Sequence, residues 1–241
     1  MKVSLISTTP NAARLLVFTK QTRLQMSVDG MAKVMAMPEA ELLAELTYMA
    51  NTIPSSWEFV DYVFMVEGVS RAYTHQQVRT RAASYAQQTL RVLDVSKGFD
   101  FVYTDRNKQD SKALQVINYA MGVVQDAYAE LVRLGQPPED ARGILPTNIA
   151  TNIVCKFNLR TMAELAKSRT GGRTQGEYQQ VINAMCDCVI AEHPWAEKFM
   201  FSKGRDLFAD VEAFAKDEWP TDLLARGRLL KIVDKMRKEL T

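Results

Sequence analysis

The sequence predicts a mixed α/β fold (α+β), and three observations lead to that prediction. Short segments rich in β-branched and aromatic residues, which favour strands, recur along the chain between helical segments. Residues 109–134 show the clearest helical periodicity in the sequence. The 241 residues, 47% of them hydrophobic, are enough to bury a sizeable core. Because no repeat, low-complexity tract or linker marks a boundary, we expect a single domain over residues 1–241.

Four segments are expected to form strands. The second contains Phe59, Tyr62 and Phe64 among β-branched residues, and we expect Gly68 to end it. The third follows a turn at Lys97-Gly98. The predicted strands span residues 2–8, 57–66, 101–103 and 150–157.

Helices are expected between and after these strands. Pro38 suits the first turn of a helix that ends near Ala50, and Gly30 is expected to interrupt the chain before it. Ser70 is expected to cap a further helix. The C-terminal tail is expected to be helical, with a break at Trp219-Pro220. The predicted helices before that tail span residues 11–20, 38–50, 70–78, 109–134, 138–142, 159–169 and 174–191.

The long helix at residues 109–134 carries one regular apolar seam. Its members follow one another at spacings of three and four residues, which places them on one helix face. We expect this seam to be buried by helix-on-helix packing, either within the chain or between subunits. The seam consists of Leu114, Ile117, Met121, Val124, Tyr128 and Leu131.

Composition excludes several classes of protein. A net charge of +2 gives no general argument for a polyanionic partner, so we expect neither stable nucleic-acid binding nor membrane association. No apolar run approaches the roughly 20 residues that a membrane span needs. The N-terminal apolar run is too short for a signal peptide. Three cysteines without a framework spacing indicate a reducing, cytoplasmic location.

Common catalytic and metal-binding motifs are scarce. Cys186 and Cys188 are too close in sequence for a usual zinc pair, and His75 and His193 are the only histidines, so we expect no metal site. So few histidines, with no Gly-x-Ser-x-Gly turn, argue against a nucleophilic triad. No glycine-rich phosphate loop is present, and no spacing singles out a pair of carboxylates.

Residues 67–92 concentrate arginine beside uncharged hydrogen-bonding side chains. The four arginines are Arg71, Arg79, Arg81 and Arg91, with almost no acid between them. Guanidinium groups bind phosphate through two parallel hydrogen bonds. A solvated basic helix is the alternative, and composition alone favours it.

Three later arginines add to this segment. Arg142 lies on a predicted short helix, Arg160 follows a predicted strand, and Arg169 ends a predicted helix. Each taken singly is more often a surface residue. Taken together with residues 67–92, they indicate an anionic ligand such as a nucleotide.

The order of these residues resembles the flavin-dependent thymidylate synthases. Their signature is Arg-His-Arg, seven residues and then Ser, with an earlier Ser among the seven and an Arg two places after the last Ser. The corresponding residues here are Arg79-Thr80-Arg81, Ser84, Thr89 and Arg91. The resemblance covers roughly residues 50–180, and its later pieces are residues 138–146, 150–154, 158–160, Arg169 and 174–178.

This resemblance implies a fold, an assembly and an activity. The fold would be a central twisted sheet flanked by long helices, in a homotetramer whose active sites are shared between chains. NADPH would reduce FAD, and methylenetetrahydrofolate would give one carbon to C5 of dUMP. The reduced flavin would supply the hydride that completes dTMP, with no cysteine nucleophile.

The resemblance also assigns site residues by position. Contacts with the nucleotide are implied for Gln76, Ser84, Gln87, Thr89, Arg91, Arg142 and Arg169. Contacts with FAD are implied for Arg79, Thr80, Arg81, Asn158 and Arg160. Arg91 would bind the phosphate, with Thr89 supplying a hydroxyl where the family has Ser. Arg169 would contact the pyrimidine carbonyl, so Arg169 and Thr89 are the predicted catalytic residues.

The sequence departs from the family pattern mainly on the flavin side. Thr80 replaces the central His of the signature, and Phe59 follows Glu58 where the family has His. The other departures are Ala86-Gln87, Val92 and Gly176. Two alternatives therefore stay open: an enzyme of the same fold that methylates or hydroxymethylates dUMP or dCMP, and a non-catalytic nucleotide-binding homologue.

Overall fold

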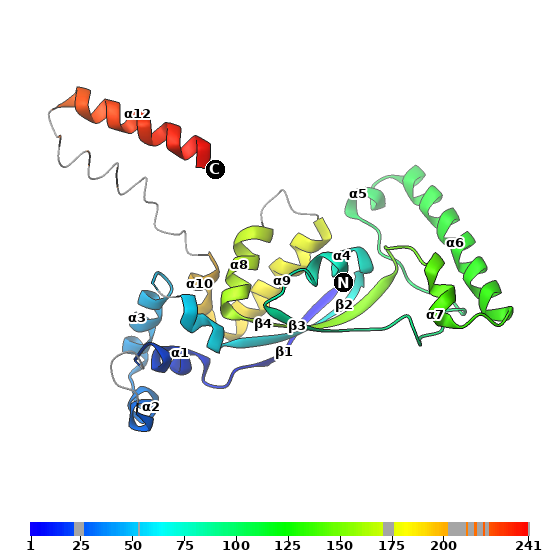
Figure 1. The fold of residues 1–241 in the computed structure, drawn as a ribbon, viewed down its shortest axis with the longest axis horizontal. Coiled ribbons are helices and arrows are strands. Elements are labelled where there is room, and N and C mark those ends of the chain that lie inside the picture. The colour runs from blue at the N-terminus through cyan, green and yellow to red at the C-terminus, as the bar shows by residue number, and fades with distance from the viewer. Residues whose placement is uncertain are drawn as a thin grey trace. The chain divides into compact units, whose positions relative to one another are not determined.

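The structure is a computed structural model that describes residues 1–21, 27–52, 54–170, 176–201 and 222–240, with residues 211, 215 and 219 between the last two ranges (Figure 1). The chain divides into two compact units, Met1–Phe201 and Ser202–Thr241. A single domain over residues 1–241 stays a prediction. All the predicted site residues lie in the first unit.

A four-stranded antiparallel sheet organises the first unit, and its strand order is β1-β2-β4-β3. The strands are β1 (Lys2–Thr8), β2 (Asp61–Ser70), β3 (Ala83–Gln87) and β4 (Ala150–Asn158). The first and last of these confirm the strands predicted at residues 2–8 and 150–157. Cys155 of β4 pairs with Phe64 on one side and with Tyr85 on the other, which sets the register of the three strands.

One predicted strand is present with other bounds, one predicted strand was wrong, and one strand was not predicted. The strand expected at residues 57–66 begins at Asp61, because Pro54–Phe59 forms a 3-10 turn, η1. Gly68 does not end it: the register shifts between Val66 and Val69, and the strand continues to Ser70. The positive φ of 64° at Gly68 suits this bulge. Residues 101–103 form only one isolated bridge, Phe101 to Ile149.

The helices largely follow the sequence expectations. Gly30 lies inside a helix and does not interrupt the chain, because Ser27 caps that helix and its Oγ accepts a hydrogen bond from Gly30 N at 3.3 Å. Residues 171–175 and Pro220 lie outside the described residues. The described helices are α1 (Ala12–Gln21), α2 (Val28–Met35), α3 (Glu39–Met49), α4 (Arg71–Gln77), α5 (Asp105–Lys108), α6 (Ser111–Arg133), α7 (Pro138–Ala141), α8 (Leu159–Arg169), α9 (Gly176–Glu192), α10 (Glu197–Phe201) and α12 (Leu223–Leu240), with short 3-10 turns η2 (Arg142–Ile144) and η3 (Pro194–Ala196).

The core lies between one face of the sheet and the layer of α8 and α9 (Figure 1). Residues of the central strands alternate between buried and partly exposed, as expected when one face is covered. Phe157 of β4 is fully buried, with its ring centroid 6.3 Å from that of Phe64 and 5.9 Å from that of Tyr85. Aromatic contacts across three strands therefore hold the sheet against the helices.

The apolar seam of α6 is less buried than the sequence predicted. Only Tyr128, at 1% exposure, is fully buried, and the other seam residues are half-buried. The helix lies beyond one end of the sheet, near α5 and α7 (Figure 1). Gly98 of the preceding loop approaches the helix so closely that a Cβ would lie 2.8 Å from Gln125 Nε2. Short elements thus cover the seam only in part.

Candidate functional site

The turn after α4 is held from two directions. The Tyr85 hydroxyl on β3 lies 2.8 Å from the carbonyl oxygens of both Gln77 and Thr80. Burial, above all, raises the pKa of Tyr85 to about 12, so its hydroxyl keeps the proton that it donates. From α8, Thr161 Oγ1 donates to the carbonyl of Ala82 at 3.1 Å. The Arg-Thr-Arg turn therefore has a fixed place between α4, β3 and α8.

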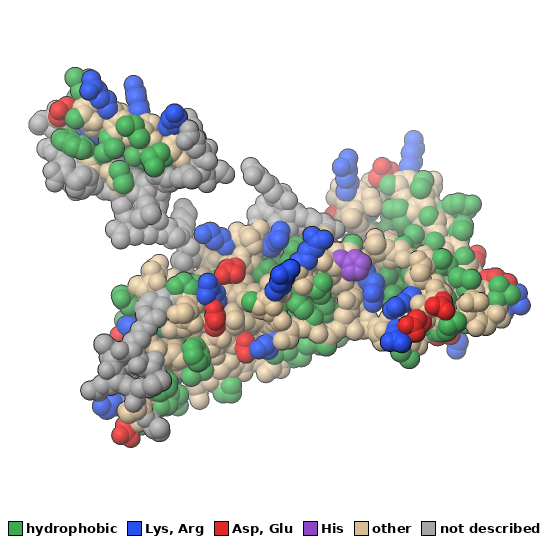
Figure 2. Space-filling view, in the orientation of Figure 1, with side chains coloured by type: hydrophobic (Ala, Val, Ile, Leu, Met, Phe, Trp, Pro, Cys, Tyr) green, Lys and Arg blue, Asp and Glu red, His purple; other side chains and the backbone are tan. Residues whose placement is uncertain are grey.

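Arg79 and Arg81 give this turn two solvent-exposed positive charges. Both residues are exposed, and neither forms an ion pair with a carboxylate in the part of the chain that the structure describes. Figure 2 shows Lys and Arg side chains projecting beside a His side chain, in the region where Figure 1 places α4 and β3. Guanidinium groups that lack a carboxylate partner are suited to an anionic ligand.

Asn158 and Arg160 lie at this same end of the sheet, where β4 passes into α8. Asn158 is the N-cap of α8, and its Oδ1 accepts a hydrogen bond from Thr161 N at 2.8 Å. Arg160 pairs with Glu58 at 2.7 Å and with Glu164 at 3.3 Å. The hydrogen bond that Arg160 Nη1 donates to Glu58 Oε1 is the main cause of the raised pKa of Arg160. Asn158 and Arg160, which are both predicted to contact FAD, therefore already have hydrogen-bond or ion-pair partners within the chain.

The predicted nucleotide residues on α4 and β3 face different ways. Ser84 is exposed on the sheet face that α8 and α9 do not cover. Gln87 points to the opposite face, where its Nε2 lies 3.0 Å from Thr74 Oγ1 and 3.4 Å from Thr151 Oγ1. Gln76 is half-buried on α4. Gln87 therefore links β3 to α4 and β4.

Beyond β3, Arg91 and Arg142 meet at one residue of α7. Arg91 Nε lies 3.0 Å from Glu139 Oε1, and Arg142 Nε donates to the Glu139 carbonyl at 3.1 Å. The Thr89 hydroxyl, which is predicted to contact the nucleotide, accepts a hydrogen bond from the Arg91 backbone N at 3.1 Å. Two arginines far apart in sequence thus lie side by side, as a shared anion site requires.

Arg71 belongs to the same cluster, although the sequence analysis did not include it among the site residues. Its Nη2 donates to the Gln88 carbonyl at 3.1 Å, and its buried Nε has no hydrogen-bond partner among the described residues. Burial and the nearby charge of Arg142, in that order, lower the pKa of Arg71. The sequence signal was its place one residue after the cap Ser70, within a stretch already recognised as similar to the family.

Arg169 is positioned by a separate contact. Its guanidinium lies 5.3 Å from the centre of the Tyr178 ring on α9, and that ring meets Tyr73 of α4 edge-on at 5.5 Å. Next to Tyr178, Glu177 accepts hydrogen bonds from Ser70 N at 2.7 Å and from Ser70 Oγ at 2.5 Å. The first turn of α9 therefore holds both α4 and Arg169. Among the described contacts, none joins Arg169 directly to Arg91 or Arg142.

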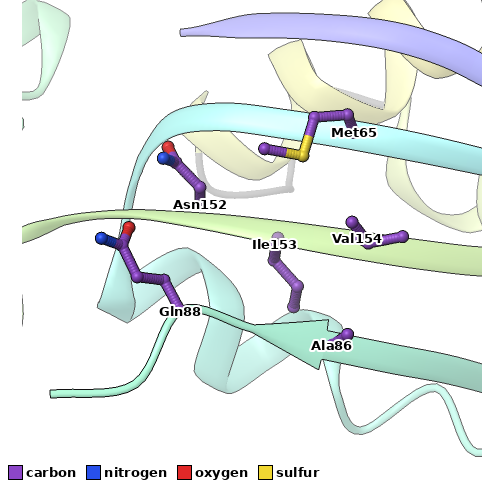
Figure 3. A pocket seen from close by; sticks show the side chains of 6 residues that line it. All are labelled: Met65, Ala86, Gln88, Asn152, Ile153 and Val154. Atoms are coloured by element: carbon purple, nitrogen blue, oxygen red, sulfur yellow. The ribbon is translucent and has the colours of Figure 1, made fainter. Parts of the chain in front are cut away.

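The predicted flavin residues and the arginine cluster lie at opposite ends of β3, whereas the predicted nucleotide residues Gln76 and Ser84 lie at the flavin end. The flavin set surrounds the start of the strand, and the cluster of Arg71, Arg91 and Arg142 follows its end. A five-residue strand separates its two ends by about 14 Å. Between them, the uncovered sheet face carries a shallow pocket of about 250 Å³ (Figure 3). Its lining is Met65, Ala86, Gln88, Asn152, Ile153 and Val154.

That pocket is apolar apart from two amides. Figure 3 shows the side chains of Gln88 and Asn152 at the same end of the pocket, and the Gln88 carbonyl is the one that accepts the hydrogen bond from Arg71. Asn152 Oδ1 accepts a hydrogen bond from Gly68 N at 3.0 Å, which fixes its orientation. The arrangement could seat a planar ring on the apolar surface, with amide groups at its edge.

The described residues offer little other chemistry. No three His, Cys, Asp or Glu side chains in the described ranges could hold a metal ion together. The thiols of Cys155, Cys186 and Cys188 are free, and burial raises the pKa of Cys155 and Cys186 to about 12. Such thiols are poor nucleophiles. No described helix combines the length and apolar character needed to cross a membrane.

The fold and site define the class as an α/β protein with a basic cluster at the edge of an antiparallel sheet. The chain belongs to the family described as "Thymidylate synthase complementing protein" (Thy1), whose model matches residues 4–195. The match lies within the first unit and includes every predicted site residue.

Relatives named flavin-dependent thymidylate synthase match most of the chain. The one from Geobacter sulfurreducens is 31% identical over 196 residues, covering 80% of this chain and 84% of the relative. The one from Sulfolobus acidocaldarius is 30% identical over 206 residues, covering 83% of this chain and 76% of the relative.

A solved structure shares the fold. It is the UMP/dUMP methylase PolB from Streptomyces cacaoi bound with 5-Br dUMP, with a TM-score of 0.71 over 85% of this chain and 96% of that chain. Its sequence identity is 16%, so the likeness concerns the fold alone.

Proposed function

We propose that this protein is a flavin-dependent thymidylate synthase that methylates C5 of dUMP to give dTMP. The convergence of Arg71, Arg91 and Arg142 supports this most directly, because a mononucleotide offers a phosphate and the cluster offers three guanidinium groups. Only Glu139 balances Arg91 among the described ion pairs. A phosphate can take the place of that carboxylate on Arg91.

The nucleotide would extend from this cluster toward Arg169. Arg91, Arg142 and Arg71 hold the phosphate, while Thr89 keeps the Arg91 backbone in place. Arg169, supported by the Tyr178 ring, binds a pyrimidine carbonyl and stabilises the negative charge that develops when C5 acts as the nucleophile. Ser84 and Gln76 complete the polar contacts of the nucleotide.

The cofactor of this reaction is FAD, with NADPH and methylenetetrahydrofolate as co-substrates. When bound, the flavin supplies the hydride that reduces the transferred carbon to a methyl group. The open guanidinium groups of Arg79 and Arg81 fit the diphosphate of FAD. Thr80 can offer a hydrogen bond, but it cannot carry a proton as His does. Asn158 and Arg160 act mainly by ordering the start of α8 beside this turn.

A homotetramer with shared active sites accounts for the separation along β3. Flavin and nucleotide must touch for hydride transfer, whereas the arginine cluster proposed to bind the phosphate lies at the other end of β3 from the predicted flavin residues of the same chain. If one chain contributes the flavin set and another the nucleotide set, both requirements are met. The uncovered face of the sheet, which carries Ser84 and Val154, is then available to bind the flavin or pyrimidine ring.

A second candidate is a methylase or hydroxymethylase of the same fold acting on dUMP or dCMP. The shared fold with a UMP/dUMP methylase supports it, because the fold by itself does not select the reaction. Thr80 and Phe59 also stand where the family has histidines. Both replacements affect residues expected near the flavin and leave the residues expected to bind the phosphate unchanged. A non-catalytic nucleotide-binding homologue is the remaining alternative.

Product analysis tests the proposal. Purified protein is incubated with methylenetetrahydrofolate and either dUMP or dCMP, with and without NADPH, after reconstitution with FAD. The expected result is flavin absorbance in the protein and, only with NADPH, a product whose mass shows that a methyl group has replaced the C5 hydrogen of dUMP. A hydroxymethyl product, or reaction with dCMP, would support the second candidate. Nucleotide binding without any product would leave the non-catalytic homologue.

We expect a Thr80→His variant to bind FAD as tightly as the wild-type protein or more tightly. The Thr80 carbonyl, rather than its side chain, makes the contact with Tyr85, so the turn should keep its shape. FAD affinity is measured by fluorescence titration, with Thr80→Ser as the matched control. A marked loss of affinity in Thr80→His would contradict this view and indicate a pocket rebuilt around threonine.

A further inference from the structure

The hydroxyl of Tyr85 faces the Arg-Thr-Arg turn at the point where the backbone of that turn closes. It lies 2.8 Å from the carbonyl oxygen of Gln77 and 2.8 Å from that of Thr80. Because a hydroxyl has one proton to donate, the two carbonyls share it in a three-centre hydrogen bond. The Thr80 backbone N donates to the same Gln77 carbonyl at 3.0 Å. One side-chain atom of β3 therefore joins the first and last residues of the turn at residues 77–80.

Packing and hydrogen bonds keep the Tyr85 side chain at the turn. Its ring packs edge-on against the buried ring of Phe157, with the two centroids 5.9 Å apart. Its hydroxyl oxygen lies 3.5 Å from Gln77 Nε2, and Gln77 Oε1 accepts a hydrogen bond from the Tyr73 hydroxyl at 3.2 Å. Gln77 and Tyr73 are both 0% exposed. Since an unpaired polar group is costly to bury, the Gln77 amide keeps one orientation between its two tyrosine partners.

Arg79 and Arg81 extend from the backbone that these contacts hold. Arg79 lies between the two carbonyls that share the Tyr85 proton. Arg81 lies between the carbonyls of Thr80 and Ala82, and the second of these accepts a hydrogen bond from α8. Both arginines are exposed, and neither forms an ion pair with a carboxylate among the described residues. The backbone of the turn therefore determines the region that the two guanidinium groups can reach.

We propose that Tyr85 is a positioning residue of the flavin site, whose hydroxyl fixes the turn so that Arg79 and Arg81 present their guanidinium groups to the diphosphate of FAD. This role rests on the proposed function, which places FAD at the turn. The hydroxyl donates its proton to the backbone, so it acts through the turn and not on the ligand. A turn that has its bound shape before the ligand arrives loses less conformational entropy on binding.

A hydroxyl that only stabilised the fold would have a different effect. Its loss would lower the free energy of unfolding but leave the FAD affinity of the folded protein unchanged. A positioning hydroxyl affects FAD affinity in protein that stays folded, and the size of its effect depends on the arginines that it positions. Binding measurements can therefore separate the two roles.

The first experiment compares FAD binding by the wild-type protein and by Tyr85→Phe, which keeps the ring against Phe157 and removes only the hydroxyl. Fluorescence titration is expected to show about 3- to 10-fold weaker binding, the size of one neutral hydrogen bond. The dUMP affinity, measured by calorimetry, is expected to stay the same, because the arginine cluster lies at the other end of β3. Tyr119→Phe is the matched control, since it removes the hydroxyl of a tyrosine that is 77% exposed on α6. Circular dichroism checks that each variant is folded.

The second experiment tests whether the hydroxyl acts through the arginines and the backbone. In an Arg79→Ala background, Tyr85→Phe is expected to weaken FAD binding by a smaller factor than in the wild-type background, because one of the positioned groups is absent. Amide hydrogen exchange is measured by mass spectrometry without any ligand. It is expected to be about 3- to 10-fold faster in Tyr85→Phe at residues 78–80, whose backbone N–H groups donate to nearby carbonyls.

Three results would each overturn the positioning role and leave the proposed function standing. They are unchanged FAD affinity in Tyr85→Phe, an equal loss of affinity in the two backgrounds, and unchanged exchange at residues 78–80. A wild-type protein that takes up no FAD would instead refute the proposed function, and the positioning role with it.

Discussion

An Arg91→Ala variant is expected to bind dUMP about 10- to 100-fold more weakly than the wild-type protein. A hydrogen bond to a charged group contributes about 1.5–3 kcal/mol, and each 1.4 kcal/mol is about tenfold in the dissociation constant. The loss follows from the position of Arg91, which reaches Glu139 in the same cluster as Arg142 and Arg71. Isothermal titration calorimetry at one fixed salt concentration measures the affinity.

Two comparisons make this prediction specific. Glu139→Gln removes the carboxylate that occupies Arg91, so dUMP affinity is expected to stay the same or increase. Arg106→Ala changes an exposed arginine on α5 and is expected to have no effect. Arg71→Ala is expected to weaken dUMP binding like Arg91→Ala if the buried Nε donates to the phosphate. Unchanged affinity in Arg91→Ala would refute its assignment to the phosphate.

A Phe157→Ala variant is expected to lower the free energy of unfolding by about 3–5 kcal/mol. The Phe157 side chain is fully buried and contacts the rings of Phe64 and Tyr85. Its removal leaves a cavity between three strands and the helix layer, which the surrounding residues can fill only in part. Urea unfolding followed by circular dichroism measures the change.

Phe59→Ala is the matched control, because the same side chain is 58% exposed at that position. It is expected to change the free energy of unfolding by no more than about 0.5 kcal/mol. Equal losses in the two variants would mean that Phe157 does not lie in the core. Because Phe157 is remote from the arginine cluster, dUMP affinity of the folded Phe157→Ala protein should be retained.

Local patterns were sufficient to predict most of the elements. The strand-favouring composition of residues 150–157, the cap at Ser70 and the periodicity of residues 109–134 are properties of neighbouring residues, and the structure confirms each element. Strand β3 was missed because only Tyr85 among its five residues has a marked strand preference. Its pairing with β4, rather than its own composition, makes it a strand.

For the candidate site too, some features follow from local sequence and others depend on contacts between distant segments. The sequence order alone identified the family and predicted an anionic ligand, because spacing within residues 79–91 is a local property that the chain carries without folding. The meeting of Arg91 with Arg142 at Glu139, and the inclusion of Arg71, depend on contacts between distant segments. No local pattern encodes such contacts.

The sequence by itself therefore determined most of the helices and strands and the family, and it predicted the arginines that a nucleotide would need. Only the tertiary structure decided that Arg91 and Arg142 meet at Glu139 while the Arg-Thr-Arg turn lies at the other end of β3, and that the seam of α6 is covered only in part. The physical reason is that periodicity and motif spacing report on residues close in the chain. Burial and charge pairing, in contrast, depend on which remote segments pack together.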